Sequence, residues 1–455
     1  MAIEFIDMKR ITPSLSYACA ARILALTAAV AVAPVPVPFA MAASPAWVAT
    51  WQASPQPVWG SEFLFPTHVP PILQDQTVRS LARVSLGGPR LRVVLSNAYG
   101  SQPLIVGKVT AAGTQGDGAV RADRLRAVTF AGRDGVSIPP GASVTSDPVA
   151  LSVPTRAQLA ISIYVPNETM VNTFHWDGRQ TSWIAPGDQT SMPTLSNGNG
   201  AIVTTTVRVL LTGIQVETEP AARTVVVIGD SITDGATATL DRDSRWPDFL
   251  AARFAPRNVA VVNAGISGAR LLSDGMGVRA LARWDRDVLE QPGVRSVIVM
   301  LGINDIAWPG TAFAPQARRP SLDDLTTGYR RLVERAHRHG VRVIGATLTP
   351  FEGALPGTPL SNYYDMDKDA LRERVNDWIR RSGVFDAVID FDAALRDPAH
   401  PARIDARYDS GDHLHPGDEG NRAMAEYVDL DAVAPGRDSL RGLIPNPIRH
   451  PIPNP

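Results

Sequence analysis

The chain contains a single cysteine, Cys19, among its 455 residues. Cys19 lies before the apolar stretch 23–32, which follows a positively charged start and precedes a small-x-small cleavage pattern at residues 40–42. This order is typical of a secretory signal peptide, which we place at residues 1–42. The residues before Cys19 do not form a lipobox, so no lipid anchor is predicted. The mature chain would then lack disulfides, which suits a secreted or periplasmic protein without a stable membrane anchor.

The chain also lacks an excess of charge of either sign. Its 44 basic and 45 acidic residues give a formal net charge of -1. Nucleic acids and acidic membranes are recognised by clustered positive charge, so neither is predicted as the main partner. The length and the ordinary globular composition indicate two or three domains.

Sequence signals for bound groups are missing as well. Glycines are spaced through residues 263–275, but not as in a dinucleotide-binding loop, and no acidic partner stands where that motif needs one. The acidic runs 241–243 and 365–369 lack the ligand spacing of a calcium loop, and we expect them to be solvated. The sequence therefore predicts no cofactor and no metal.

Residues 43–216 show short alternating runs between turn residues. Examples are the runs 91–96, 142–145 and 158–164, with turn clusters such as residues 87–89 between them. Strands at this spacing, without a helical period of useful length, favour an antiparallel β-sandwich. We expect an accessory domain of this class.

The pattern changes after a polar linker at residues 217–223. Apolar strands alternate with helices from residue 224 to residue 434, which predicts a three-layer α/β sheet of flavodoxin-like type. The expected strands are 224–228, 259–262, 296–301, 341–348 and 387–391, and the expected helices are 245–254, 322–339, 367–381 and 416–428. Gly340 is placed to end the second of these helices, and Pro416 to begin the last. Residues 435–455, rich in Pro, Arg and Asn, are predicted to be disordered.

A candidate nucleophile follows the first of these strands. The run 225–228 leads directly into Gly229-Asp-Ser231, a tight turn at the edge where parallel sheets place their chemistry. An exposed serine needs a base and a group that orients the base. His415 and Asp412 supply both from one loop. The Gly-x-Ser-x-Gly pattern of the α/β-hydrolase elbow is absent around Ser231.

His413 is the alternative base. It is adjacent to Asp412 in the sequence and therefore too close to be oriented by that carboxylate easily, so His415 is favoured. Taken alone, the loop would also suit a surface histidine before a helix.

Acyl chemistry at Ser231 would also need hydrogen-bond donors for an oxyanion. Gly268 follows the second strand and would let a backbone N–H approach a substrate closely, and Asn304 follows the third strand with a side-chain amide. The backbone N–H of Ser231 is the third expected donor. An ordinary turn residue is the alternative for Asn304, and Asp305 is expected to brace its turn rather than to react.

These blocks resemble the SGNH hydrolase family, also called the GDSL esterase/lipase family. That family is marked by Ser, Gly, Asn and His in separated blocks, which Ser231, Gly268, Asn304 and His415 match in order. Ile232 stands where the name-giving motif has Leu, a conservative departure. The resemblance covers about half of the chain and implies a flavodoxin-like fold and metal-free ester hydrolysis through an acyl-enzyme.

His175 and Trp308 are the candidate substrate-binding residues. Segment 173–179 gathers a histidine, two aromatic residues and an arginine that could line a cleft, although core aromatics with a surface His175 are favoured. Trp308 and Phe313 could shape an acyl or sugar pocket or pack in the core. The expected function is a secreted hydrolase of short or medium acyl esters or of O-acetylated carbohydrate. An acyltransferase, a lysophospholipase and an inactive carbohydrate-binding protein are the alternatives; the expected partner is a small-molecule or carbohydrate ester.

Overall fold

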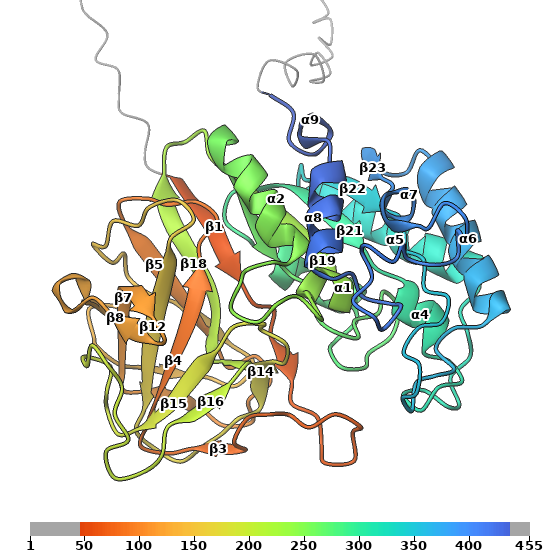
Figure 1. Cartoon of the computed structure of the whole chain (residues 1–455). Helices are drawn as coiled ribbons and strands as arrows, with labels where there is room; N and C mark the ends of the chain where they lie inside the picture. The colour runs from red at the N-terminus through yellow and green to blue at the C-terminus, as the bar shows by residue number, and fades with distance from the viewer. Residues whose placement is uncertain (1–45, 437–455) are drawn as a thin grey trace, which may run out of the picture. The chain divides into compact units, whose positions relative to one another are not determined.

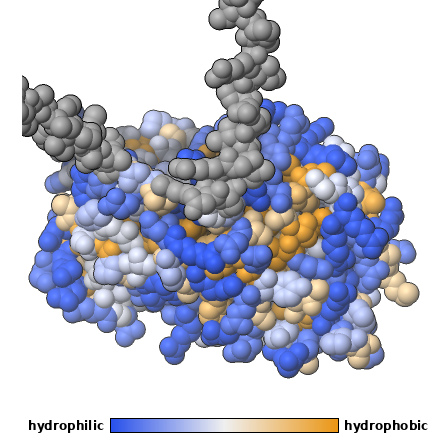
Figure 2. All heavy atoms as spheres, turned by 90° about the horizontal axis from the view of Figure 1, so that it is seen from above, coloured by the Kyte–Doolittle hydropathy of each residue, from blue (hydrophilic) through white to orange (hydrophobic). Residues whose placement is uncertain are grey.

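The computed structural model describes residues 46–436. The predicted signal peptide and nearly all of the predicted tail lie outside the described residues. Between residues 46 and 436, no helix has both the length and the apolar composition needed to cross a bilayer. The face shown in Figure 2 is mostly hydrophilic, with hydrophobic residues gathered in one area.

Up to Thr218 the strands are antiparallel and form two larger sheets, with orders β1-β18-β5-β11 and β16-β15-β4-β12-β7-β8, where β9 also pairs with β7. The first sheet comprises β1 (Ala46–Gln52), β18 (Leu211–Thr218), β5 (Leu91–Ser96) and β11 (Ser143–Thr145). The second comprises β16 (Val203–Thr205), β15 (Ser182–Pro186), β4 (Gln76–Arg83), β12 (Gln158–Val165), β7 (Lys108–Gly116), β8 (Ala119–Val120) and β9 (Arg126–Val128). The antiparallel strands predicted from the sequence are therefore present.

Short strand pairs complete this N-terminal region. They are β10 (Val136–Ile138) with β6 (Leu104–Val106), β13 (Thr169–Met170) with β3 (Ile72–Leu73), and β14 (Thr173–His175) between β17 (Arg208–Val209) and β2 (Gln56–Pro57). Of these, β14 bears on the functional site, because the segment that follows it reaches the catalytic half of the chain.

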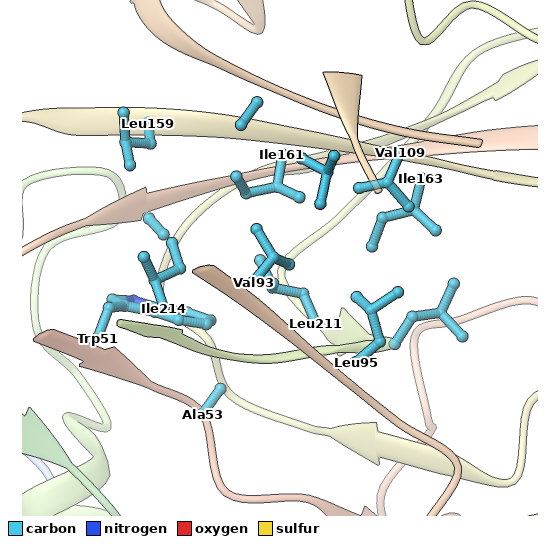
Figure 3. Packing of buried hydrophobic residues seen from close by; sticks show 14 of the residues in the cluster. Trp51, Ala53, Val93, Leu95, Val109, Leu159, Ile161, Ile163, Leu211 and Ile214 are labelled. Atoms are coloured by element: carbon cyan, nitrogen blue, oxygen red, sulfur yellow. The ribbon is translucent and has the colours of Figure 1, made fainter. Parts of the chain in front are cut away.

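Side chains from both larger sheets meet in one hydrophobic cluster. Figure 3 shows Leu159, Ile161 and Ile163 of β12 facing Val93 of β5 and Ile214 of β18. The three β12 residues alternate along the strand, so they point to the same face. Each is at most 2% exposed, and burial of such a side chain contributes roughly 1.5–3 kcal/mol.

The C-terminal region is a five-stranded parallel sheet of order β20-β19-β21-β22-β23. Its strands are β19 (Arg223–Gly229), β20 (Val259–Asn263), β21 (Val294–Met300), β22 (Arg342–Ala346) and β23 (Ala387–Ile389). In chain order this is the 2-1-3-4-5 arrangement of flavodoxin-like sheets, as predicted.

Helices cover both faces of this sheet (Figure 1). Val225 and Val227 of β19 pack with α2 (Trp246–Phe254) and α8 (Asp418–Tyr427), whereas Val226 and Ile228 pack with α3 (Ala280–Trp284), α5 (Leu322–Arg338) and α6 (Met366–Arg381). Burial on both faces explains why β19 is a continuous apolar run. The shorter helical segments are α1 (Ser231–Asp234), α4 (Ile303–Ala307), α7 (Phe391–Leu395), α9 (Leu430–Val433), a π-helix at Asp285–Leu289 and 3-10 turns at Ala122–Arg124 and Ala255–Arg257.

Local signals set most helix ends. Gly340, with φ 67°, follows the end of α5 as predicted. The prediction for Pro416 was wrong, because α8 begins at Asp418 and Pro416 forms a β-bridge with Asp409 in the preceding loop. The last strand is shorter than predicted because Asp390 already caps α7, accepting a hydrogen bond from the Ala393 N–H at 3.2 Å.

The N-terminal region covers the edge of the parallel sheet at β20. The Ala49 N–H donates to the Pro292 carbonyl at 2.9 Å, and the Val261 N–H of β20 donates to Ser85 Oγ at 3.1 Å. An uncovered edge strand offers unpaired backbone groups to other chains, so this contact also protects the sheet.

Acidic residues of the loop before α2 strengthen the contact between the two regions. Asp241 accepts the Thr181 N–H at 2.6 Å, and Asp243, whose side chain is 6% exposed, pairs with Arg83. In the second acidic run, Asp365 caps α6. The prediction that these runs are solvated was therefore wrong, since their carboxylates serve as structural acceptors.

Candidate active site

Ser231 stands at the carboxyl edge of the parallel sheet, as the first residue of α1. β19 ends at Gly229, and a Cβ there would collide with the Thr233 side chain, so the turn requires glycine. Asp230 caps α1 by accepting the Ile232 N–H at 3.1 Å, and burial raises the pKa of Asp230 to about 7. The tight turn thus presents the Ser231 hydroxyl at the edge of the sheet.

Ser231, His415 and Asp412 form one chain of hydrogen bonds. His415 Nε2 lies 2.8 Å from Ser231 Oγ, and His415 Nδ1 lies 2.6 Å from Asp412 Oδ2. With its proton on Nδ1, the ring donates to Asp412 and accepts from Ser231. Burial works to raise the pKa of Asp412, but the hydrogen bond and charge of His415 hold it below its ordinary value.

The loop that carries the histidine is folded around the same carboxylate. Asp412 Oδ1 accepts the N–H groups of Leu414 at 3.0 Å and of His415 at 2.8 Å. His413 turns away: its backbone has φ 61°, its side chain is 48% exposed and its Nδ1 pairs with Asp409. The structure therefore brings His415, rather than His413, to Ser231.

Donors from three strand ends line the cavity that also contains the Ser231 hydroxyl. Among residues 46–436, neither the Ser231 N–H nor the Gly268 N–H has a hydrogen-bond acceptor. Asn304 Nδ2 donates to the Ala269 carbonyl at 3.1 Å, which leaves its second N–H for a ligand. Gly268 has φ 72°, where an L side chain is strained. The predicted set of donors is thus gathered around one point.

Two residues hold the asparagine and its neighbouring loop in place. Tyr363 donates its hydroxyl hydrogen to Asn304 Oδ1 at 2.7 Å, which fixes the direction of the amide. Asp305 accepts the N–H groups of Leu271 at 2.7 Å and Leu272 at 2.9 Å, so it braces the loop after β20. Burial raises the pKa of Asp305 to about 6. Tyr363 was not anticipated, because nothing near it in the sequence marks a partner 59 residues away.

A second buried carboxylate, Asp234, orients the Gly268 turn. Its Oδ2 accepts the N–H of Ser267 at 2.8 Å and the Ser267 hydroxyl at 2.9 Å. Its Oδ1 lies 2.9 Å from Nε2 of His175, and His175 Nδ1 lies 3.0 Å from the Ser54 carbonyl. Burial opposes protonation of His175, but the charge and hydrogen bond of Asp234 raise its pKa above the ordinary value.

The expectation that His175 binds substrate is not supported. Its side chain is buried, both ring nitrogens are engaged, and it does not line the cavity. The two residues that follow it, Trp176 and Asp177, do line the cavity. Segment 173–179 therefore reaches the site, but through different residues.

The cavity beside Ser231 has a volume of about 450 Å³ and is lined largely by apolar side chains. Trp308 lies in its wall, 2% exposed, with its ring centroid 4.6 Å from that of Phe313. Other lining residues include Met276, Leu360, Tyr363 and Leu414 from the C-terminal region and Leu64, Phe65 and Trp176 from the N-terminal region. Within residues 46–436, no group of three or more His, Cys, Asp or Glu side chains is arranged to hold a metal ion.

Residues 227–423 match the model of the GDSL-like Lipase/Acylhydrolase family. Similar solved structures include an acetylxylan esterase from Geobacillus stearothermophilus, at 24% identity and a TM-score of 0.32, covering 46% of this chain and 92% of that chain. A GDSL-like lipase from Bacteroides thetaiotaomicron has 19% identity and a TM-score of 0.33, covering 45% of this chain and 85% of that chain. A lipolytic protein of the G-D-S-L family from Veillonella parvula has 19% identity and a TM-score of 0.32, covering 45% and 96%. No curated protein matches the chain.

Proposed function

Through residues 227–423 the chain belongs to the GDSL-like Lipase/Acylhydrolase family of ester-hydrolysing enzymes, and we propose that it acts on carboxylic esters through Ser231, His415 and Asp412. One observation carries this proposal: an unbroken chain of hydrogen bonds runs from Asp412 through His415 to Ser231, beside free donors in the same cavity. A nucleophile, its base and an orienting carboxylate in this geometry are the parts of an acyl-transfer site.

In the proposed first half-reaction, His415 Nε2 removes the proton from Ser231 Oγ as that oxygen attacks the ester carbonyl carbon. The oxyanion accepts hydrogen bonds from the N–H groups of Ser231 and Gly268 and from Asn304 Nδ2. The tetrahedral intermediate collapses, the bond to the alcohol oxygen breaks, and the alcohol leaves with the proton from His415.

In the second half-reaction, water attacks the acyl-enzyme carbonyl and gives a proton to His415. Collapse releases the carboxylic acid, and Ser231 Oγ recovers its proton. Asp412 stays ionised and stabilises the imidazolium in both steps. The lowered pKa of Asp412 supports this role, since its carboxylate stays charged throughout the neutral range.

We propose short or medium acyl groups as the acid portion of the substrate. The cavity volume of about 450 Å³ falls within the range of about 300–1,000 Å³ typical of small-molecule sites. Its walls near Ser231 are apolar, which favours an acyl chain over a charged group. O-acetylated carbohydrate remains within this class, because an acetyl group also fits.

Export and the role of the N-terminal region are part of the same proposal. The pattern of residues 1–42 supports a cleaved signal peptide and a secreted or periplasmic enzyme without a stable membrane anchor. We propose that the antiparallel sheets of residues 43–216 form an accessory β-sandwich. Two features support it: the larger sheets share a hydrophobic cluster, and the region contributes to the catalytic cavity.

An acyltransferase would use the same acyl-enzyme, with an alcohol in place of water. Adding alcohol acceptors and analysing the products separates the two reactions, because transfer gives a new ester and hydrolysis gives only free acid.

The proposal is tested with p-nitrophenyl esters from acetate to hexadecanoate. We expect kcat/KM to be highest for a short or medium chain and to fall for long chains that exceed the cavity. A maximum at the longest chains, together with cleavage of lysophospholipid, would indicate the lysophospholipase alternative. Hydrolysis of none of these esters would favour an inactive binding protein.

A further inference from the structure

Asp177 is a carboxylate in the catalytic cavity that comes from the N-terminal region. It lines the same cavity as Ser231 and His415, and its side chain is 15% exposed. Its one charged partner is Arg179, whose Nη1 lies 4.0 Å away, beyond hydrogen-bond distance. Among residues 46–436, no group donates a hydrogen bond to the Asp177 carboxylate. An acceptor in a largely apolar cavity is therefore left without a donor.

The backbone on both sides of Asp177 is held firmly. On one side, the buried ring of His175 is fixed by Asp234 at 2.9 Å and by the Ser54 carbonyl at 3.0 Å. On the other side, Arg179 Nε donates to the Ala238 carbonyl at 2.9 Å. The carboxylate is therefore preorganised beside the segment that follows Ser231, and a ligand would not have to order it.

The surroundings of Asp177 favour a ligand with hydroxyl groups. A buried carboxylate without donors is unfavourable, and a ligand that supplies O–H groups would remove this penalty. Burial and the charge of Asp234 raise the pKa of Asp177, which works against attraction of a cation. Arg179 also lies close enough to offset part of the negative charge.

Trp176 provides an apolar surface next to this acceptor. Its ring is stacked on Phe65, with centroids 5.4 Å apart and planes at 11°, and both residues line the cavity. A flat aromatic surface beside a hydrogen-bond acceptor complements a sugar or polyol ring, which has apolar C–H groups on its faces and hydroxyls at its edge.

We propose that Asp177 forms a binding subsite for the alcohol portion of the ester, and that this portion is a sugar or polyol whose hydroxyls donate to the carboxylate. The inference rests on the proposed ester hydrolysis and adds the chemical class of the leaving group. It gives the N-terminal region a direct part in substrate selection, because Ser231 acts on the acyl carbon while Asp177 selects the alcohol.

The test compares three esters of the acyl group that the p-nitrophenyl series shows to be best: its p-nitrophenyl, glucose and choline esters. Asp177→Leu removes the acceptor at similar volume, and Asp177→Asn keeps a carbonyl acceptor without the charge. Glu168→Gln, an exposed carboxylate change in the same region, is the matched control. Thermal melting of each variant monitors folding.

For Asp177→Leu we expect kcat/KM on the glucose ester to fall roughly 10- to 100-fold, the loss of hydrogen bonds to a charged group. The p-nitrophenyl ester should change by less than about threefold, because its leaving group has no hydroxyl to lose a contact. Asp177→Asn should lie between the wild type and Asp177→Leu on the glucose ester, and Glu168→Gln should match the wild type on all three esters.

Several results would overturn the subsite. They are equal losses on all three esters, a selective loss on the choline ester, or wild-type hydrolysis of the p-nitrophenyl ester without hydrolysis of the glucose ester. Failure of the wild type on every ester would instead contradict the proposed function itself, so the two failures are distinguishable.

Discussion

Gly268→Ala is expected to remove most of the activity, because it displaces the turn that carries an oxyanion donor. The added Cβ would lie 2.5 Å from Met276 Sδ and 2.9 Å from Trp308 Cζ2. The end of Met276 can move, but Trp308 is 2% exposed and packs against Phe313 with ring centroids 4.6 Å apart. The turn, rather than the indole, must therefore give way.

The size of the effect follows from this displacement. Alanine keeps its backbone N–H, so activity is lost only if the N–H leaves the distance of about 2.7–3.1 Å from the oxyanion that catalysis needs. Loss of one such donor lowers kcat by roughly 100- to 1,000-fold. The left-handed backbone adds about 1–2 kcal/mol of strain to the folded state.

Gly340→Ala is the matched control for that strain. Gly340 has φ 67°, close to the 72° of Gly268, but a Cβ there meets no atom within 4 Å. Both variants should lose comparable melting temperature, and only Gly268→Ala should lose kcat on the best p-nitrophenyl ester. The reasoning is refuted if Gly268→Ala keeps kcat within about threefold of the wild type, since a displaced donor must cost more than that.

Asp412→Asn should lower kcat by roughly 10⁴-fold, because the amide cannot hold His415 in the required tautomer; an unchanged kcat in steady-state assays would exclude Asp412. His415→Ala should abolish turnover while His413→Ala, an exposed change, keeps kcat within about twofold; the reverse pattern would make His413 the base. His175→Gln should lower the melting temperature most at acidic pH. The raised pKa of His175 means that its contribution is complete below the ordinary value of 6.5 and is lost as pH rises through the folded-state pKa. A melting-temperature difference that increases with pH would contradict this sign.

The residues that could be predicted from the sequence are those that stand directly at strand ends. Ser231, Gly268 and Asn304 each follow an apolar run, so the geometry of a parallel sheet alone gathers them at one edge. His415 and Asp412 could be paired because they share one short loop. The strand order follows from the same alternation of strands and helices.

Contacts between distant segments could not be predicted in this way. The pair of His175 and Asp234 joins the two regions, and the bond from Tyr363 to Asn304 joins loops without a shared pattern. Segment 173–179 carried a signal in its aromatic residues and histidine, but only the fold decides that Asp177 lines the cavity while His175 is buried. Short helices such as α1 and α4 were missed because four or five residues are too few for a helical period.

The most direct measurement compares the wild type with Ser231→Ala in hydrolysis of the best p-nitrophenyl ester, with mass spectrometry of the acyl-enzyme after rapid quenching. We expect the variant to lose activity by at least roughly 10⁴-fold at an unchanged melting temperature, and the acyl adduct to appear on Ser231 of the wild type alone. Equal activity in both proteins, or an adduct on another residue, would contradict the assignment of Ser231 as the nucleophile.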